Sequence, residues 1–363
     1  MRAPARILIA GGGTGGHAIP ALCVAGELAG RRATVEFVGA SSGIEADLVP
    51  RAGYPFHPLL LRGMAGGVFA RGRAAALFAR AVLACRGLMR SFEPGAVLGV
   101  GGYASAPAVA AARSLGIPTF LHEQNSVPGR VNRLASRVAS GTFVTFPEAA
   151  GVLRGARVVG MPTRREFFAA DRERALAELG LEPPVVLVFG GSGGALRINL
   201  AAQEAFGSGE TPYTVVQVAG RRDYGRLSTK NPRHLILEYE PELWRYVAAC
   251  ELAVTRAGAG SLFDLAAAGR AAILVPYPYA AQDHQLHNAR YFTGRGAAEL
   301  MLDGEVDARR LRERVEGLLG DKGRREQLAA RMKELATPDA AAEVATALLE
   351  AAWRKDDQGR MKR

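Results

Sequence analysis

The chain carries the same glycine-rich turn twice, about half of its length apart. An apolar run at residues 7–10 leads into Gly-Gly-Thr-Gly-Gly at 12–16, and another at 185–189 leads into Gly-Gly-Ser-Gly-Gly at 190–194. Each copy is typical of a buried strand, a tight turn that lets a ligand approach closely, and a helix start whose unpaired N–H groups favour anions. Two copies indicate two similar α/β domains and a cleft for a phosphate-bearing ligand.

Strand-like and helical runs alternate through both halves of the chain, so each half is expected to hold a parallel sheet. Proline and glycine cluster between Phe146 and Pro162, which marks a junction. We therefore expect domains at 1–161 and 162–339, a helix at 340–355 that packs back on the first domain, and a frayed basic tail at 356–363. The expected strands are 7–10, 35–38, 96–100, 119–121 and 142–145 in the first half, and 185–189, 214–218, 235–237, 252–255 and 272–275 in the second.

The formal net charge of +11 points to an anionic partner, which is a nucleic acid, an acidic membrane surface or a phosphorylated substrate. Between Asp47 and Glu93 there is no acidic residue, although the segment contains arginines and many large apolar residues. This mixture is typical of a surface that lies on anionic lipid; a core helix with a solvated basic face is the alternative. No apolar run is long enough to span a bilayer.

Two more glycine-rich turns, at 101–105 and 256–261, also follow expected strands. Ligands of open α/β sheets bind at the carboxyl ends of the strands, so all four turns are expected to face one cleft. His17 directly follows the first turn, where it is a candidate general base, or else a helix-start histidine bonded to backbone. The polar run His-Glu-Gln-Asn at 122–125 suits hydrogen bonds to a sugar, with an ordinary capped loop as the alternative.

The turn at 256–261 is followed by Asp264, one helical turn further on. The turn suits a diphosphate and the carboxylate suits ribose hydroxyls, whereas the alternative is an acid that complements a helix dipole. His284 and His287 share a helical face, but no third ligand with suitable spacing accompanies them, so we expect no metal there.

Taken together, the motifs at 12–20, 101–105, 122–125, 190–195 and 256–264 resemble those of the MurG family of N-acetylglucosaminyltransferases. The resemblance implies a GT-B fold, in which two Rossmann-like domains with parallel sheets face an inter-domain cleft. It also implies an inverting, metal-independent enzyme without a cofactor. Such an enzyme transfers N-acetylglucosamine from UDP-N-acetylglucosamine to the muramyl 4-hydroxyl of lipid I, which gives lipid II for peptidoglycan.

The resemblance assigns lipid I and an anionic membrane surface to the first domain, at the cytoplasmic face of the plasma membrane, and UDP-N-acetylglucosamine to the second. It implies His17 as the base, and Glu123 is the runner-up because it lies on the other polar loop expected at the cleft. The acceptor diphosphate is expected at Gly15, Gly16, Gly101, Gly102, Tyr103 and Ser105. The donor contacts are expected at Thr14, Gly15, Gly16, Asn125, Arg164, Ser192, Glu240 through its backbone, Ala259, Gly260, Ser261, Leu262, Phe263, Asp264 and Gln285.

Three positions depart from the family pattern. Gly193 stands where the family usually has Gln, Asp264 is one methylene shorter than the usual Glu, and Met161 replaces Asn in a Gly-Asn-Pro run. We expect these departures to shift substrate affinity, but none of them removes a motif.

Other classes remain as alternatives. A diacylglycerol glycosyltransferase or a UDP-N-acetylglucosamine 2-epimerase shares the fold and the donor site, although the motifs at 101–105 and 122–125 argue against both. A nicotinamide oxidoreductase needs Gly-x-Gly-x-x-Gly and an acid about 20 residues further on, which the first turn matches only loosely. A basic nucleic-acid-binding protein would bind nucleic acid with an affinity that falls steeply with salt. We expect no nucleic-acid partner for this chain.

Overall fold

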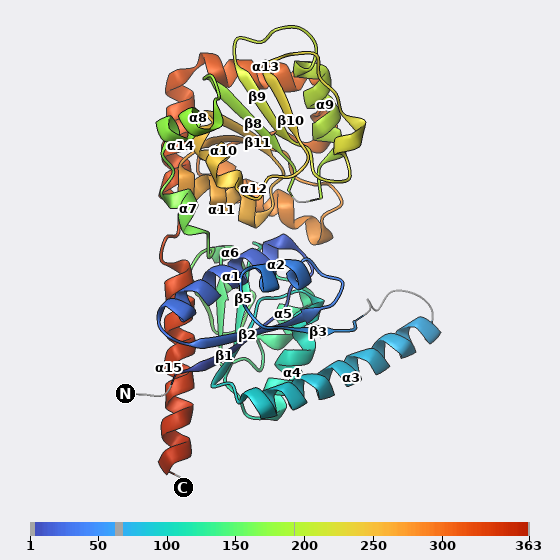
Figure 1. Ribbon diagram of the computed structural model, residues 1–363, viewed down its shortest axis with the longest axis vertical. Coiled ribbons are helices and arrows are strands. Elements are labelled where there is room, and N and C mark those ends of the chain that lie inside the picture. The colour runs from blue at the N-terminus through green and yellow to red at the C-terminus, as the bar shows by residue number, and fades with distance from the viewer. Residues whose placement is uncertain (1–3, 62–67, 192, 362–363) are drawn as a thin grey trace. The chain divides into compact units, whose positions relative to one another are not determined.

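The computed structural model describes the backbone of residues 4–61, 68–191 and 193–361. The chain divides into two compact units (Figure 1). Unit 1 consists of Met1–Pro162 together with Asp339–Arg363, and unit 2 consists of Thr163–Pro338. Each unit is an α/β fold around its own parallel sheet, which confirms the predicted fold class.

Unit 1 contains a seven-stranded sheet in the order β3-β2-β1-β4-β5-β6-β7, and every neighbouring pair is parallel. The order reverses at β1, so the carboxyl ends of β1 and β4 lie where ligands of doubly wound sheets bind. Its strands are β1 (Arg6–Ala10), β2 (Thr34–Ala40), β3 (Phe56–Leu59), β4 (Ala96–Gly99), β5 (Thr119–Glu123), β6 (Gly141–Val144) and β7 (Ala156–Val158). Its helices are α1 (Gly15–Gly30), α2 (Glu45–Arg51), α3 (Val68–Phe92), α4 (Ala106–Ser114), α5 (Arg130–Ala135), α6 (Pro147–Ala150) and α15 (Ala340–Met361), with the 3₁₀ turn η1 (Tyr103–Ser105).

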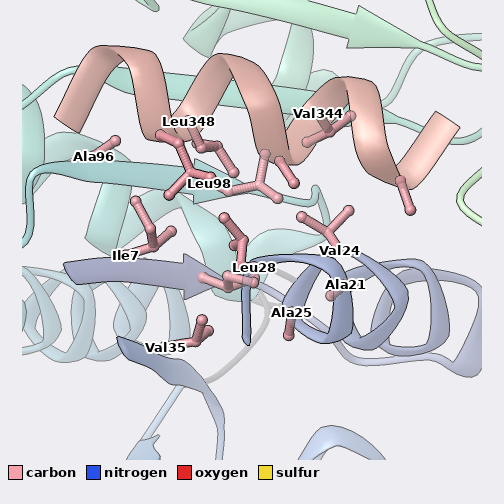
Figure 2. Close-up of a cluster of buried hydrophobic side chains, with 14 of the residues drawn as sticks. Ile7, Ala21, Val24, Ala25, Leu28, Val35, Ala96, Leu98, Val344 and Leu348 are labelled. Atoms are coloured by element: carbon pink, nitrogen blue, oxygen red, sulfur yellow. The ribbon is translucent and has the colours of Figure 1, made fainter. Parts of the chain in front are cut away.

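The last helix, α15, completes the core of unit 1. Its Val344 and Leu348 are fully buried and belong to one apolar cluster with Ile7 and Leu98 of the sheet and Leu28 of α1 (Figure 2). The opposite face of the sheet is covered by α3 and α4 through a second apolar cluster. With both faces covered, the central strands β1 and β4 are apolar except for Arg6 at the start of β1, as expected of a buried parallel sheet.

Unit 2 repeats this plan with a six-stranded parallel sheet in the order β10-β9-β8-β11-β12-β13. The order reverses at β8, so the second glycine turn lies at the switch point of its own sheet. Its strands are β8 (Val185–Phe189), β9 (Thr214–Val218), β10 (His234–Leu237), β11 (Leu252–Thr255), β12 (Ala271–Leu274) and β13 (Glu299–Leu300). Its helices are α7 (Arg165–Phe168), α8 (Arg172–Leu179), α9 (Leu196–Phe206), α10 (Leu243–Ala249), α11 (Ala259–Ala268), α12 (His284–Thr293), α13 (Ala308–Gly320) and α14 (Lys322–Glu334), with the 3₁₀ turns η2 (Tyr224–Arg226), η3 (Ala281–Asp283) and η4 (Asp303–Glu305).

The structure differs from the sequence prediction at the sheet edges and at the chain end. Strands β3, β7 and β13 were not predicted, because they are only two to four residues long and β3 contains Pro58. Helix α15 continues to Met361, whereas a frayed tail was expected from residue 356. Two contacts hold the helix just before this stretch: Arg354 pairs with Glu350, and Lys355 donates to the Pro94 carbonyl. Among the described residues, no helix is both long and apolar enough to cross a membrane.

Candidate functional site

In unit 1, three loops with candidate residues follow three adjacent strands. The first glycine turn follows β1, the turn at 101–105 follows β4, and the loop at 124–129 follows β5. Because β1, β4 and β5 are parallel neighbours, their carboxyl ends lie at one edge of the sheet. The structure therefore brings the three unit 1 motifs of the sequence together at this edge.

The first glycine turn has a backbone that side chains rarely permit. Gly11, Gly12 and Gly13 have φ values of 131°, 146° and 94°. A Cβ on Gly11 would lie 2.6 Å from the Gly101 carbonyl oxygen, so the first two turns pack backbone against backbone. Helix α1 begins directly afterwards at Gly15. The N–H groups of His17 and Ala18 donate to the Thr14 carbonyl at 3.1 Å, whereas those of Gly15 and Gly16 precede the first hydrogen bonds of the helix. This geometry suits an anionic group.

His17 lies in the first turn of α1, beside both glycine turns. Its Nδ1 is 2.9 Å from the Thr14 hydroxyl, and its ring lies against Gly101, where a Cβ would be 3.3 Å from Cδ2 and 3.4 Å from Nε2. Glycine at 101 thus makes room for the imidazole. If Nε2 is to accept a proton, Nδ1 must carry the hydrogen and the Thr14 hydroxyl must accept it.

The turn after β4 is tied to the first turn and to itself. A Cβ on Gly102, which has a φ of 68°, would lie 2.5 Å from the Gly12 carbonyl oxygen. The Ser105 hydroxyl donates to the Gly102 carbonyl at 3.0 Å. Tyr103 is partly exposed at the same edge, and burial raises the pKa of its hydroxyl. The side chain of Ser105 is therefore engaged in holding the turn, while that of Tyr103 reaches the surface.

Most of the polar run at 122–125 is buried, which differs from the expected sugar-binding loop. His122 and Glu123 belong to β5, and with Gln124 they are at most 2% exposed. His122 Nε2 lies 3.1 Å from the Gly160 carbonyl oxygen, and its Nδ1 lies 3.1 Å from Gln124 Nε2. Burial lowers the pKa of His122 to about 4, so the ring is neutral near pH 7 and links strand to loop. Only Asn125 of the four is partly exposed.

Glu123, the second candidate base, has both carboxylate oxygens engaged. Oε1 accepts from the backbone N–H of Asn125 at 3.0 Å, and Oε2 accepts from the Gly129 N–H at 3.0 Å and from Asn132 Nδ2 at 2.9 Å. With both oxygens engaged in these bonds and the side chain 2% exposed, Glu123 is poorly placed to reach a substrate hydroxyl. The geometry thus gives Glu123 a role in fixing the loop and favours His17 as the base.

In unit 2, the second glycine turn packs against the loop that follows β9. Ser192 lies outside the described residues. Gly194 has a φ of 79°, and a Cβ there would lie 2.5 Å from the Ala219 carbonyl oxygen. Arg222 Nε donates to the Gly193 carbonyl at 2.7 Å, and its guanidinium lies beside that glycine. The sequence interpretation missed Arg222, although it follows β9 at the same edge of the sheet.

Arg164 and Asp264 of unit 2 interact electrostatically. Arg164 donates to the Pro241 carbonyl at 3.3 Å, and its guanidinium carbon lies 4.9 Å from the centre of the Phe167 ring. Burial raises the pKa of Asp264 to about 7, and the positive charge of Arg164 opposes that rise. The neighbouring Glu240 is partly exposed, and its side chain accepts from the Glu242 N–H at 2.8 Å.

Helix α11 begins inside the turn that follows β11. A Cβ on Gly258 or Gly260 would meet nothing within 4 Å, so the backbone here faces open space. Ser261 is partly exposed at this helix start, whereas Ala259, Leu262 and Phe263 are buried. Of the predicted donor contacts in this helix, the buried three can reach a ligand only through their backbone.

Arg256, which precedes this helix, is an internal group rather than an exposed cation. It is 8% exposed, and its Nη1 lies 2.6 Å from Asp303 Oδ1. The same nitrogen donates to the carbonyls of Val275 and Pro276. The ion pair ties the turn after β11 to η4, which follows β13, and the two carbonyl bonds tie it to the loop after β12. The glycine backbone is left as the group that faces outward.

Gln285 lies in the first turn of α12. Its Oε1 accepts from the Tyr277 N–H at 2.9 Å, and Asn288, fully buried in the same helix, donates to the Ala257 carbonyl at 3.3 Å. Gln282 and Asp283 have φ values of 56° and 51°, a conformation that costs a non-glycine residue energy and often marks functional loops. No sequence signal predicted that conformation. Among the described residues, no group of three or more His, Cys, Asp or Glu side chains is arranged to hold a metal ion.

Comparison with known proteins places both halves in one family. The model of the glycosyltransferase family 28 N-terminal domain matches residues 7–144, and that of the family 28 C-terminal domain matches residues 185–344. A curated relative from Rubrobacter xylanophilus is 64% identical over 324 residues, which are 88% of this chain and 96% of the relative. It is named UDP-N-acetylglucosamine–N-acetylmuramyl-(pentapeptide) pyrophosphoryl-undecaprenol N-acetylglucosamine transferase. A relative of the same name from Desulforudis audaxviator is 39% identical and covers 92% of this chain and 95% of its own length.

Solved structures agree with this assignment. The crystal structure of Acinetobacter baumannii MurG matches with a TM-score of 0.77 and 28% identity, over 96% of this chain and all of that one. A Staphylococcus aureus MnaA–UDP structure matches with a TM-score of 0.68 and 12% identity over 94% of this chain and 95% of that one, so it shows the shared fold alone. The two relatives exceed 30% identity over most of their length, and the domain models cover most of the chain. The chain therefore belongs to glycosyltransferase family 28 and, within it, to the MurG family of N-acetylglucosamine transferases.

Proposed function

We propose that this chain transfers N-acetylglucosamine from UDP-N-acetylglucosamine to the muramyl 4-hydroxyl of lipid I, with inversion to a β-1,4 link, and so forms lipid II. The observation that carries the proposal is the 64% identity, over 96% of its length, to a relative named for this transfer. The alternative is a UDP-N-acetylglucosamine 2-epimerase; two solved structures of this kind match with 12–13% identity, which shows a shared fold alone.

Unit 1 supplies the acceptor groups in this proposal. The N–H groups at the start of α1 and the turn at 101–105 bind the acceptor diphosphate, because exposed backbone amides at a helix start favour anions. His17 takes the proton from the attacking hydroxyl at Nε2, while the Thr14 hydroxyl holds Nδ1 at 2.9 Å and so fixes the ring. Glu123 holds the loop that carries Asn125, through the 3.0 Å bond to its N–H.

Unit 2 supplies the donor groups. The backbone at Gly258 and Gly260, which faces open space, takes the diphosphate at the start of α11. Asp264 accepts from the ribose hydroxyls, and Arg164, Gln285 and Glu240 complete the donor contacts. Arg222, held against the second glycine turn, adds a positive charge that stabilises the leaving UDP.

We further propose that unit 1 binds the cytoplasmic face of the plasma membrane peripherally through α3. One face of α3 buries Ala81, Cys85 and Met89 in the core. The remaining face exposes Arg73, Arg80, Leu83 and Arg90, with Leu83 at 67%. Arginines beside an exposed leucine suit anionic lipid, where each contributes about 1 kcal/mol.

The membrane proposal is tested with vesicles that contain anionic lipid. Changing Arg73, Arg80 and Arg90 to Glu should abolish salt-sensitive vesicle binding and spare activity on a soluble acceptor. The matched control changes Arg310, Arg324 and Arg331 of unit 2 to Glu, with the same loss of charge. Equal binding by both triple variants and the unchanged protein would refute the role of α3.

The transfer itself is tested by incubating the purified chain with UDP-N-acetylglucosamine and a lipid I analogue. We expect a lipid-linked disaccharide whose new link is β, as shown by the anomeric coupling in its NMR spectrum. Formation of UDP-N-acetylmannosamine instead would favour the epimerase, and an α link would contradict inversion.

A further inference from the structure

Glu45, at the start of α2, places its carboxylate inside the first glycine turn. Its Oε2 accepts from the Gly13 N–H at 2.7 Å, and its Oε1 accepts from the Ala40 N–H at 2.9 Å. The residue is 2% exposed. A single side chain thus joins the turn after β1 to the end of β2, and nothing above assigns it a role.

Three glycines make room for this carboxylate. A Cβ on Gly12 would lie 2.1 Å from the carboxyl carbon of Glu45, one on Gly43 would lie 2.1 Å from Oε2, and one on Gly39 would lie 2.9 Å from Cγ. Any side chain at these positions would displace Glu45. Gly39 and Gly43 belong to β2 and the loop that follows it, and Gly12 belongs to the turn after β1, so the cradle joins two segments of the fold.

The position of the Glu45 carboxylate is unusual, because a glycine turn at a helix start commonly binds the anionic group of a ligand. Burying a carboxylate is costly unless it is hydrogen-bonded. In the part of the chain that the structure describes, no Lys, Arg or His forms an ion pair with Glu45, and its hydrogen-bond donors are two backbone N–H groups. The carboxylate therefore acts as a built-in anion that occupies the Gly13 amide.

Occupying the Gly13 amide has two consequences. It fixes a backbone in which Gly11, Gly12 and Gly13 all have positive φ values and which would otherwise be flexible. It also leaves the amides further along the turn, at Gly15 and Gly16, as the donors for an incoming anion. His17 follows within the same helical turn and is oriented by the same backbone through Thr14.

We propose that Glu45 is a positioning residue of the transfer reaction, which locks the first glycine turn so that the start of α1 and His17 meet the acceptor in one geometry. This proposal rests on the proposed function, since it assigns the acceptor diphosphate and hydroxyl to that turn. Glu45 itself touches no substrate.

The test compares Glu45→Gln with Glu36→Gln. The side-chain amide introduced by Glu45→Gln can accept from only one of the two N–H groups and turns its NH₂ toward the other, whereas Glu36 lies on β2 of the same sheet and bonds His57 at 2.7 Å. We expect Glu45→Gln to lower kcat and to raise the acceptor KM, so that kcat/KM falls by about ten- to a hundredfold. UDP-N-acetylglucosamine affinity should change less than the acceptor KM, because most of the proposed donor contacts belong to unit 2. Glu36→Gln should keep kcat/KM near that of the unchanged protein.

A second readout separates positioning from overall stability. Hydrogen exchange of the amides at residues 11–17 should become faster in Glu45→Gln, while exchange in the β4 and β8 segments stays unchanged. If Glu45→Gln does not fold, Glu45→Asp, whose shorter carboxylate cannot reach both amides, is measured in the same way. A folded variant with unchanged kcat/KM, or with unchanged exchange at 11–17, overturns the proposal. If the unchanged protein fails to transfer the sugar, the proposed function fails, and the exchange measurement alone decides on the lock.

Discussion

The protonation of Asp264 should make donor affinity depend on pH. Burial raises the pKa of this carboxyl to about 7, and the Arg164 charge limits the rise. If only the carboxylate accepts from the ribose hydroxyls, the apparent Kd is the intrinsic value multiplied by one plus the ratio of protonated to charged Asp264. That factor is about 11 at pH 6, about 2 at pH 7 and about 1.1 at pH 8. UDP-N-acetylglucosamine should therefore bind about tenfold more tightly at pH 8 than at pH 6.

The measurement is isothermal titration of UDP-N-acetylglucosamine at several pH values. The intact sugar nucleotide is preferred to UDP because UDP has a terminal phosphate that itself titrates near pH 6. Asp264→Asn should bind weakly and with little dependence on pH, since the titrating group is gone. Arg164→Met should shift the midpoint of the wild-type curve to higher pH, because it removes the charge that favours the carboxylate. An affinity that does not change with pH in the unchanged protein, or the same slope in Asp264→Asn, would refute this reasoning.

Three further predictions concern unit 1. His17→Ala should lower kcat by about 10²–10⁴-fold and leave UDP affinity nearly unchanged. The measurement compares kcat of His17→Ala with that of Glu123→Ala, and a loss of this size in Glu123→Ala alone would make Glu123 the base instead. The free energy of unfolding should fall by up to about 3 kcal/mol as pH drops from 6.5 to 4, because unfolded chains protonate His122 before the folded protein does. His122→Gln should lack this part of the slope in denaturant titrations, and an identical slope would contradict it. Leu348→Ala, in the core formed by α15, should cost about 2–5 kcal/mol in the same titration, whereas a loss below about 1 kcal/mol would contradict that packing.

The fold was predictable because its signals are local. The apolar runs before residues 12 and 190 are strands β1 and β8, and the glycine turns after them lie at the switch points of two parallel sheets. The short edge strands escaped prediction because β13 has only two residues and its pairing with β12 supplies the order that its own sequence lacks. Residues 119–121 were predicted as a strand, but β5 extends to Glu123, since parallel pairing with β6 continues through that residue.

The candidate residues show the same limit. His17 stands beside the glycine turns, because it directly follows the first of them in the sequence and bonds Thr14 within it. The polar run at 122–125 gave no sign that His122 would bond the Gly160 carbonyl, a partner 38 residues away. Likewise, nothing in the sequence indicated that Arg256 would pair with Asp303, which lies 47 residues further along. Long-range polar contacts of this kind depend on how strands are ordered, which a single sequence does not state.

Acceptor-dependent release of UDP tests the central claim most directly. The purified chain is mixed with UDP-N-acetylglucosamine labelled in the sugar, with and without a lipid I analogue. The amount of UDP released and the amount of label on the lipid are measured in the same sample. The account predicts one UDP for each labelled sugar found on the lipid, and only background release when the analogue is left out. Release of UDP at the same rate without the analogue, or intact donor in its presence, would contradict it.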